Sequence, residues 1–275
     1  MDAKKAVTAQ DWYKKHGLEP DADGWFPNVP ECKNLPVDNA KWVENIAHNI
    51  QLDVPNAKAC HYNPRTMVMV CGGPTAKNYL EEIRAKSLDP DYDVFCSNKT
   101  GEWLLQNGII PQYHMILDSK KAKVKDVALK HPDITYLLAL NCDPAVFDEL
   151  KDNRVMRFFC PSNIGGENLD KQEVEKYITE PMLMICGGTM AGVRAITIAE
   201  GLGYRNLEYY GFDACIESKD EHYAYEKKHN EAILTVEAED GRQFLSTHIF
   251  ADQVSQVMQW RMMLPWVKIK VHGDS

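Results

Sequence analysis

The chain has 275 residues, of which 44% are hydrophobic and 26% are charged, and this balance is typical of a globular protein. The length suits one large α/β domain or two small ones, and we expect one domain with an extension. No run of about 18 apolar residues is present, and the first residues lack the apolar core of a signal peptide. We therefore expect no membrane span and a cytoplasmic location.

The formal net charge of −9 disfavours binding to nucleic acid and to anionic membranes. Such partners are usually met by an excess of Lys and Arg, so nucleic acid is an unfavoured partner without being excluded. The eight cysteines occur singly and form no C-x-x-C pair. This spacing indicates free thiols and argues against a zinc site.

Residues 1–64 read as an extension that packs on a core domain formed by residues 65–275. A short helix is expected over 11–16, followed by an irregular segment rich in Pro, Asp and Gly. A second helix is expected over 38–51. Its apolar residues recur at helical spacing and are expected to cover one edge of the core. They are Trp42, Ile46 and Ile50.

From residue 66 onward, short apolar runs alternate with helical patterns, which predicts a doubly wound, mostly parallel, Rossmann-like α/β sheet covered on both faces. The expected strands are 66–70, 91–96, 113–117, 134–140, 154–159, 182–186, 207–210 and, at an edge, 267–271. The expected helices are 75–86, 101–107, 120–130, 190–202 and 250–263. An Asp-Gly turn signal predicts a hairpin between 233–237 and 243–246. The polar segment 161–181 is expected to be a long loop of the kind that often covers a binding site.

The first strand leads directly into Gly72, Gly73, Pro74 and Thr75. Glycines allow backbone amides to approach a ligand closely, and proline is favoured at the first position of a helix. A helix N-terminus also carries partial positive charge. The turn is therefore a candidate phosphate site, although Gly-Gly-Pro also forms turns with a purely structural role.

A second glycine corner, Gly187-Gly188-Thr189, follows the apolar run at 182–186 and repeats this theme. In an open parallel sheet, ligands bind at the carboxyl ends of the strands, where the winding reverses. We expect the residues at those strand ends to line one crevice. They are Gly72, Gly73, Asn98, Asp118, Asn141, Gly188 and Asp213.

Several of these segments together resemble the MptE-like family, in the same order along the chain. The matching motifs are 71–75, 97–98, 104–111, 117–118, 187–191, 199–203 and 210–213. That family includes archaeal 6-hydroxymethylpterin diphosphokinases and motility-associated Maf glycosyltransferases. The resemblance covers residues 66–225 and implies the fold more specifically than the substrate.

A more distant similarity is to sialyltransferases of the CstII type, whose second strand end resembles residues 93–98. The chain differs at Gly72, where those enzymes have an asparagine, and at Asp118, where their third strand ends on an asparagine. A carboxylate repels phosphate unless a cation lies between them. Asp118 therefore favours a Mg²⁺-assisted phosphate site, or a carboxylate that holds a hydroxyl, over a CMP-sialic acid donor.

Three residues are candidates for catalysis, namely Asp118, Asp213 and His222. A histidine with an ordinary pKa near 6.5 suits a general base, and His248 is a weaker rival to His222. Asp118 and Asp213 are also the candidate metal ligands if Mg²⁺ takes part. Each assignment has a structural alternative, because Asp and Asn often cap helices and His222 is equally compatible with a surface position.

The candidate donor-binding residues lie at the two glycine corners and at neighbouring strand ends. They are Gly72, Gly73, Pro74, Thr75, Asn98, Asn141, Gly187, Gly188 and Thr189. One lysine of a basic helix is a further candidate for offsetting phosphate charge. The basic residues of this helix are Lys120, Lys121, Lys123 and Lys125.

These expectations combine into a transferase that moves a sugar from a nucleotide sugar to a hydroxyl acceptor. The alternative is a Mg²⁺-dependent diphosphoryl transfer from ATP to a 6-hydroxymethylpterin-like alcohol. A third hypothesis is a non-catalytic nucleotide-binding module. Tryptophans near both termini are candidates for a homo-oligomer contact, namely Trp12, Trp25, Trp260 and Trp266.

Overall fold

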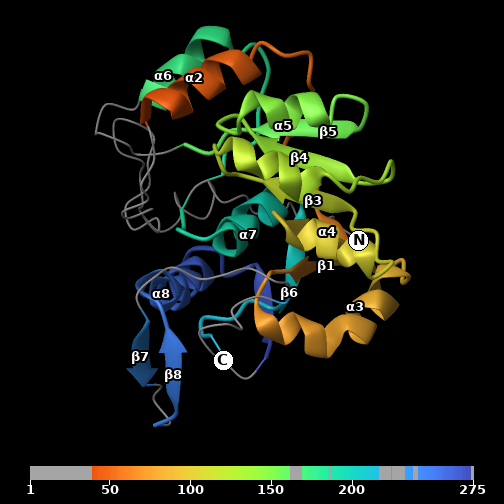
Figure 1. Cartoon of the computed structure of the whole chain (residues 1–275), viewed down its shortest axis with the longest axis vertical. Helices are drawn as coiled ribbons and strands as arrows, with labels where there is room; N and C mark the ends of the chain where they lie inside the picture. Colours follow the sequence, from red (N-terminus) through yellow and green to blue (C-terminus); the bar gives the residue numbers. More distant parts are fainter. Residues whose placement is uncertain are drawn as a thin grey trace, which may run out of the picture.

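A computed structural model describes residues 39–161, 169–185, 187–216, 224, 233–237 and 241–273. They form a seven-stranded parallel sheet in the order β5-β4-β3-β2-β1-β6-β9 and a separate antiparallel hairpin, β7-β8 (Figure 1). The sheet strands are β1 (Asn63–Val70), β2 (Tyr92–Ser97), β3 (Tyr113–Ile116), β4 (Thr135–Ala139), β5 (Arg154–Phe158), β6 (Tyr204–Tyr210) and β9 (Lys268–His272). The hairpin strands are β7 (Leu234–Glu237) and β8 (Gln243–Ser246). The predicted doubly wound α/β class and C-terminal hairpin are confirmed.

Helices cover both faces of the sheet, and several are short. The α-helices are α2 (Asn39–Asn49), α3 (Leu80–Ser87), α4 (Thr100–Gln106), α5 (Pro144–Glu149), α6 (Leu169–Tyr177), α7 (Ala191–Gly201) and α8 (His248–Met263). Two segments are 3-10 helices, η1 (Pro74–Tyr79) and η2 (Lys121–Val127). The helix predicted over 120–130 therefore forms as the shorter and tighter η2.

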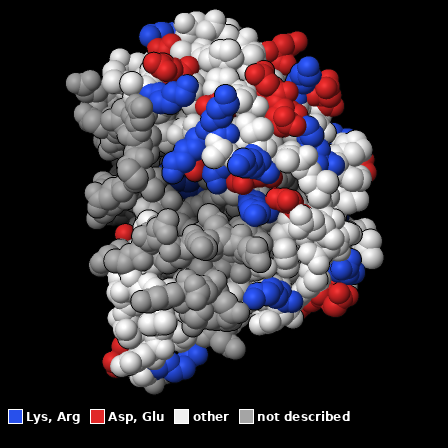
Figure 2. Space-filling view, viewed as in Figure 1, with Lys and Arg blue, Asp and Glu red and all other residues white. Residues whose placement is uncertain are grey.

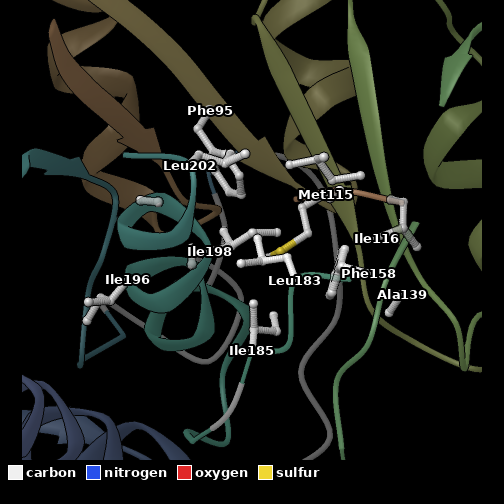
Figure 3. Close-up of a cluster of buried hydrophobic side chains, with 14 of the residues drawn as sticks. Phe95, Met115, Ile116, Ala139, Phe158, Leu183, Ile185, Ile196, Ile198 and Leu202 are labelled. Carbon is white, nitrogen blue, oxygen red and sulfur yellow. The ribbon is translucent and has the colours of Figure 1, made fainter. Parts of the chain in front are cut away.

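Strand β1 lies inside the sheet, between β2 and β6, and it is apolar along its second half because both of its faces are buried. Met67 and Met69 face the cluster that contains α7, whereas Val68 and Val70 face α3 and α4. Figure 3 shows the first of these clusters, in which Ile198 of α7 points toward Leu183 and Met115, whereas Ile196 lies on the opposite side of the helix. Apolar burial on both faces fixes the register of the strands, since a shift by one residue exchanges the faces.

The helix α2 packs beside α6 at the β5 end of the sheet, as Figure 1 shows. The predicted apolar face of α2 is buried, and it contacts side chains that follow β4 and β5. Two buried asparagines fasten the helix: Asn45 Nδ2 donates to Asn141 O at 3.0 Å, and Asn49 Nδ2 donates to Leu140 O at 2.8 Å and to Cys142 O at 2.7 Å. These bonds satisfy carbonyl groups where β4 ends.

The structure differs from the sequence-based expectation at two segments. Residues 182–185 lie alongside Phe159 and form one isolated bridge at Met184 instead of the predicted strand. No continuous strand forms because Leu183 pairs with two different segments. Its amide donates to Ala57 O, and its carbonyl accepts from the Phe159 amide. The segment 161–181, expected to be a loop, contains α6, and α5 was also not predicted.

Some expectations lie outside the described residues, namely the helix over 11–16 and the first residue of the helix expected over 38–51. The division between an extension and a core domain near residue 64 stays a prediction. Within the parts of the chain that the structure describes, every helix is too short or too polar to cross a lipid bilayer.

The winding of the sheet reverses between β1 and β6. The chain leaves β1 toward β2 on one side, whereas it leaves β6 toward β9 on the other side. Connections that diverge from adjacent parallel strands leave a crevice at the carboxyl ends of those strands. The crevice position is thus set by topology, and the two strands that flank it end at Val70 and Tyr210.

Candidate functional site

A cavity of about 300 Å³ opens at the carboxyl ends of β1, β2 and β6. This volume is at the lower end of the range of small-molecule sites. Parts of both glycine corners line it, so the two halves of the chain converge as the sequence suggested. The lining consists of 71–73, 97–100, Lys123, Asp126, 189–192, 211–213, Phe250 and Gln253.

A pair of hydrogen bonds joins the loop after β1 to the loop after β6. The amide of Thr75 donates to Asp213 Oδ2 at 2.9 Å, and the Thr75 hydroxyl donates to Asp213 Oδ1 at 2.6 Å. The Gly73 amide adds a bond to Gly211 O at 2.9 Å. A Cβ on Gly73 would lie 2.4 Å from Asp213 Oδ2, so this close approach requires glycine. We call the Thr75–Asp213 pair the clamp.

The clamp uses most of the donors of the first glycine corner. The amides of Gly73 and Thr75 bond to the β6 loop, and Pro74 has no amide hydrogen. Among the described residues, none accepts a hydrogen bond from the Gly72 amide, and Gly72 lines the cavity. The Gly72 carbonyl accepts a bond from the Ala224 amide at 2.9 Å. The first corner therefore mainly connects the two halves of the sheet.

The second corner retains its free donors. Gly187 and Gly188 have φ values of 72° and 105°, a backbone region that favours glycine, and they turn the chain into α7. The amides of Ala191 and Gly192, the first two residues of this 11-residue helix, have no acceptor among the described residues and lie at the cavity wall. Unpaired amides at a helix N-terminus attract anions.

Hydrogen bonds with side chains of α7 and α8 hold the second corner in place. Arg194 Nε donates to Gly188 O at 2.8 Å. The Thr189 amide and hydroxyl both donate to Gln256 Oε1 of α8, at 3.0 and 3.1 Å. The loop that leads into α7 is thereby fastened to α7 through the Gly188 carbonyl and to α8 through Thr189.

Asn98 follows β2 and adopts a left-handed backbone conformation with a φ of 52°. This region is unusual for residues other than glycine, and asparagine tolerates it best. The Asn98 amide donates to Met115 O at 3.0 Å, whereas its side-chain Oδ1 is buried and has no partner. Asn98 is also one of the residues that line the cavity, so its side-chain amide is a candidate ligand contact.

Charged residues from α4, η2 and the segments next to them also line the cavity. Lys123 Nζ is 2.9 Å from Asp126 Oδ2 and 3.9 Å from Asp118 Oδ2. Lys99 also lines the cavity. Figure 2 shows that Lys and Arg side chains gather in the upper middle of this face, although the whole chain is acidic. The basic helix of the sequence thus contributes one lysine, Lys123, to the cavity.

Cys71 also lines the cavity, and its environment keeps it protonated. Burial and the nearby charge of Asp213 both raise the pKa of the Cys71 thiol. Because the thiolate is the nucleophilic form of cysteine, a raised pKa makes Cys71 part of the wall and not a nucleophile.

The remaining predicted residues have the following positions. Asp118 lies outside the cavity lining, and its Oδ1 accepts a bond from the Lys120 amide at 3.0 Å. Asn141 is buried away from the lining, with its Nδ2 bonded to Leu117 O at 2.6 Å. The lining does not include Pro74, Thr75, Gly187 or Gly188.

The structure does not test whether His222 or His248 is the better candidate for the base. His222 lies outside the described residues, and His248 begins α8 with a side chain that is not described. Phe250 and Gln253 of α8 line the cavity but were missed, since a helix expected only to pack gives no signal for them. Phe212 was within a recognised motif without being singled out.

One group of potential metal ligands occurs in the described part of the chain, and it lies outside the cavity lining. It consists of Glu82, Glu208 and His272. The Lys86 ammonium already lies 3.0 Å from Glu82 Oε1 and 2.5 Å from Glu208 Oε2. This group is therefore an ion-pair network between α3 and the β6-β9 edge.

Comparison with known proteins places the fold. A family model described as 6-hydroxymethylpterin diphosphokinase MptE-like matches residues 40–219, which confirms the resemblance carried by the motifs. No curated protein sequence matches the chain.

The solved structures that are similar to this one include the following two. The Maf glycosyltransferase from Magnetospirillum magneticum AMB-1 shares 17% identity with a TM-score of 0.58, over 88% of this chain and 38% of that protein. This chain therefore spans well under half of the Maf protein, and the likeness shows a shared fold. A mammalian sialyltransferase in complex with Gal-beta-1-3GalNAc-ortho-nitrophenol shares 10% identity with a TM-score of 0.44, over 99% of this chain and 97% of that chain.

The clamp predicts a specific difference between two substitutions of Thr75. Thr75→Val removes the hydroxyl and leaves Asp213 Oδ1 without this donor, so we expect the free energy of unfolding to fall by about 1–3 kcal/mol. Thr75→Ser keeps the hydroxyl and should lose less than about 1 kcal/mol. Urea unfolding of both variants measures the difference. Equal stability of the Val and Ser variants would contradict the clamp.

Burial of His114 predicts how stability depends on pH. Burial lowers its pKa from 6.5 to about 4, so below pH 6.5 the unfolded chain binds a proton that the folded chain does not. Stability should therefore be complete above pH 6.5 and fall toward pH 4, by up to about 1.4 kcal/mol per pH unit. The measurement is urea unfolding from pH 7 to 4, compared with His114→Gln. An equally steep loss in the Gln variant would show that other groups are responsible.

Proposed function

The chain belongs to the MptE-like family, and from this premise we propose that it is a transferase with a nucleotide-activated donor in the cavity between β1, β6 and α7. The preferred reaction is transfer of a sugar from a nucleotide sugar to a hydroxyl acceptor. The observation that carries the proposal is the pair of unpaired amides, Ala191 and Gly192, at the start of α7.

Phosphate recognition follows from the donors that the cavity wall offers. The amides of Ala191 and Gly192 supply hydrogen bonds and the partial positive charge of the helix N-terminus. Lys123 adds a full positive charge, which is partly offset by Asp126 at 2.9 Å. The Gly72 amide lies on the opposite corner of the same cavity. A diphosphate would thus be contacted from both corners.

The rest of the donor would occupy the part of the cavity near Asn98. Asn98 lines this part of the cavity, and its side-chain amide can both donate and accept hydrogen bonds, so it suits a hydroxyl of a ribose or sugar or a polar edge of a base. Phe212 and Phe250 supply apolar surface on the other side of the cavity. A few placed polar groups among apolar walls are typical of small-molecule sites.

Catalysis in this proposal depends on stabilising the leaving group and on a base. Charge that develops on the departing phosphate is stabilised by the preorganised amides of α7. The acceptor hydroxyl is deprotonated by His222 or Asp213, as the sequence suggested. Both oxygens of Asp213 already accept hydrogen bonds from Thr75, so we favour His222 as the base.

The alternative function is Mg²⁺-dependent diphosphoryl transfer from ATP to a pterin-like alcohol, which is the activity that the description of the family model names. Of the suggested ligand pair, only Asp213 lines the cavity, and its oxygens are engaged in the clamp. Asp118 bonds to its own loop. The donor set therefore fits Mg²⁺ only in part, and we favour glycosyl transfer.

Ligand binding provides the first test of the proposed function. Isothermal titration against a panel of nucleotides and nucleotide sugars, each with and without Mg²⁺, should detect at least one ligand. Lys123→Met removes a cavity charge and should weaken that ligand about tenfold, because hydrogen bonds to charged groups are the stronger ones. Lys125→Met, on the same short helix but outside the cavity, is the matched control and should change affinity less than twofold. Absence of binding by every member, or equal effects of both variants, would contradict the site.

Product analysis separates the candidate reactions. Release of the free nucleotide from a nucleotide sugar, dependent on a hydroxyl acceptor, supports glycosyl transfer. Release of AMP from ATP, dependent on a hydroxymethylpterin and Mg²⁺, supports the alternative. A bound nucleotide that survives incubation with every acceptor would instead indicate a non-catalytic binding module.

A further inference from the structure

His114 lies on β3, directly behind the loop that carries Asn98. The side chain is fully buried, and the residue pairs with Cys96 of β2 and Tyr136 of β4 in the middle of the sheet. Its Nε2 is 2.7 Å from the carbonyl oxygen of Asn98. His114 is outside the cavity lining, so any effect on a ligand passes through Asn98.

The protonation state of His114 follows from its surroundings. A carbonyl oxygen only accepts hydrogen bonds, so Nε2 must carry the hydrogen that Asn98 receives. Burial lowers the pKa of His114 to about 4, so the ring is neutral at pH 7 and Nδ1 carries no hydrogen. The buried Nδ1 has no hydrogen-bond partner. One ring nitrogen thus serves Asn98 while the other is left unsatisfied.

An unsatisfied buried acceptor lowers stability, and an apolar ring of similar shape would not carry this disadvantage. The ring also occupies the space next to Gly101, where a Cβ would lie 2.3 Å from His114 Cε1. Packing alone would be served equally well by an aromatic hydrocarbon. The feature that distinguishes histidine here is its hydrogen bond to the Asn98 carbonyl.

That hydrogen bond completes the fastening of the Asn98 backbone. The Asn98 amide is bonded to Met115 O at 3.0 Å, and the Asn98 carbonyl also accepts the Gly101 amide at 3.2 Å. A left-handed asparagine pays a small backbone cost and relaxes unless its surroundings hold it. With its backbone held on both sides, Asn98 keeps its place among the residues that line the cavity.

We infer that His114 is a positioning residue that locks Asn98 in its left-handed conformation so that the Asn98 side chain is oriented for the donor, an inference that rests on the proposed function. His114 touches neither the cavity nor the ligand. Its contribution is to the orientation of a binding group, and it is separable from the stability of the sheet.

The test compares His114→Gln with His114→Phe in the full chain. Glutamine places an amide donor near the position of Nε2, whereas phenylalanine keeps a planar ring and has no donor. The first readout needs no ligand: chemical shifts of selectively labelled Asn98 report whether its backbone is left-handed. The second readout is isothermal titration with the adenosine, cytidine, guanosine and uridine diphosphates as probes. Urea unfolding of each variant shows whether stability changes in parallel.

We expect Asn98 to stay left-handed in the wild type and the Gln variant and to leave this conformation in the Phe variant. The diphosphate that binds best should lose about tenfold in affinity in the Phe variant, as for one lost hydrogen bond, and less than threefold in the Gln variant. An unchanged Asn98 conformation in the Phe variant, or equal affinity in both variants, would overturn the inference.

Two further outcomes are also decisive. If no diphosphate binds the wild type, that result counts against the proposed function. The backbone conformation of Asn98 in the variants then decides by itself whether His114 positions Asn98. If the Phe variant does not fold, His114→Met, which is apolar and flexible, replaces it in both measurements. Affinity that follows unfolding free energy across all variants would show a merely structural role.

Discussion

The clamp between Thr75 and Asp213 is the contact on which the site depends. Parallel strands whose connections diverge leave a crevice, and nothing in the sheet itself holds the two loops at a fixed separation. Here two hydrogen bonds from one residue bind both oxygens of a carboxylate that is 138 positions away in the chain. Gly73 permits the approach because any side chain would meet Asp213. The cavity walls are positioned by this contact.

The two glycine corners look alike in sequence but differ in what they leave unbonded. In the first corner, the Gly73 and Thr75 amides are hydrogen-bonded to the loop after β6. The second corner is held through Thr189 and Gly188, and the α7 amides of Ala191 and Gly192 have no acceptor among the described residues. A polar group that is satisfied within the protein offers little to a ligand. The capacity to bind an anion therefore lies mainly in the second half of the chain.

The apolar runs predicted most strands because residues buried on both faces of a parallel sheet must be hydrophobic. The apolar run at 182–186 wrongly predicted a strand, since apolar residues also occur in irregular segments that pack against strand edges. Glycine corners and polar strand ends located the crevice for the same topological reason. The sequence does not show that Thr75 binds Asp213, because such pairing arises only in the folded chain. The role of His114 could not be predicted either, because the sequence shows only a single histidine within a short strand.

The position of a bound phosphate tests the account most directly. A crystal structure of the protein soaked with the nucleotide that binds best in titration would locate it. We expect phosphate oxygens within hydrogen-bonding distance of the Ala191 and Gly192 amides, between the two glycine corners. Phosphates bound on the exposed lysines of η2, with the cavity between β1 and β6 left empty, would contradict the site proposed for this protein.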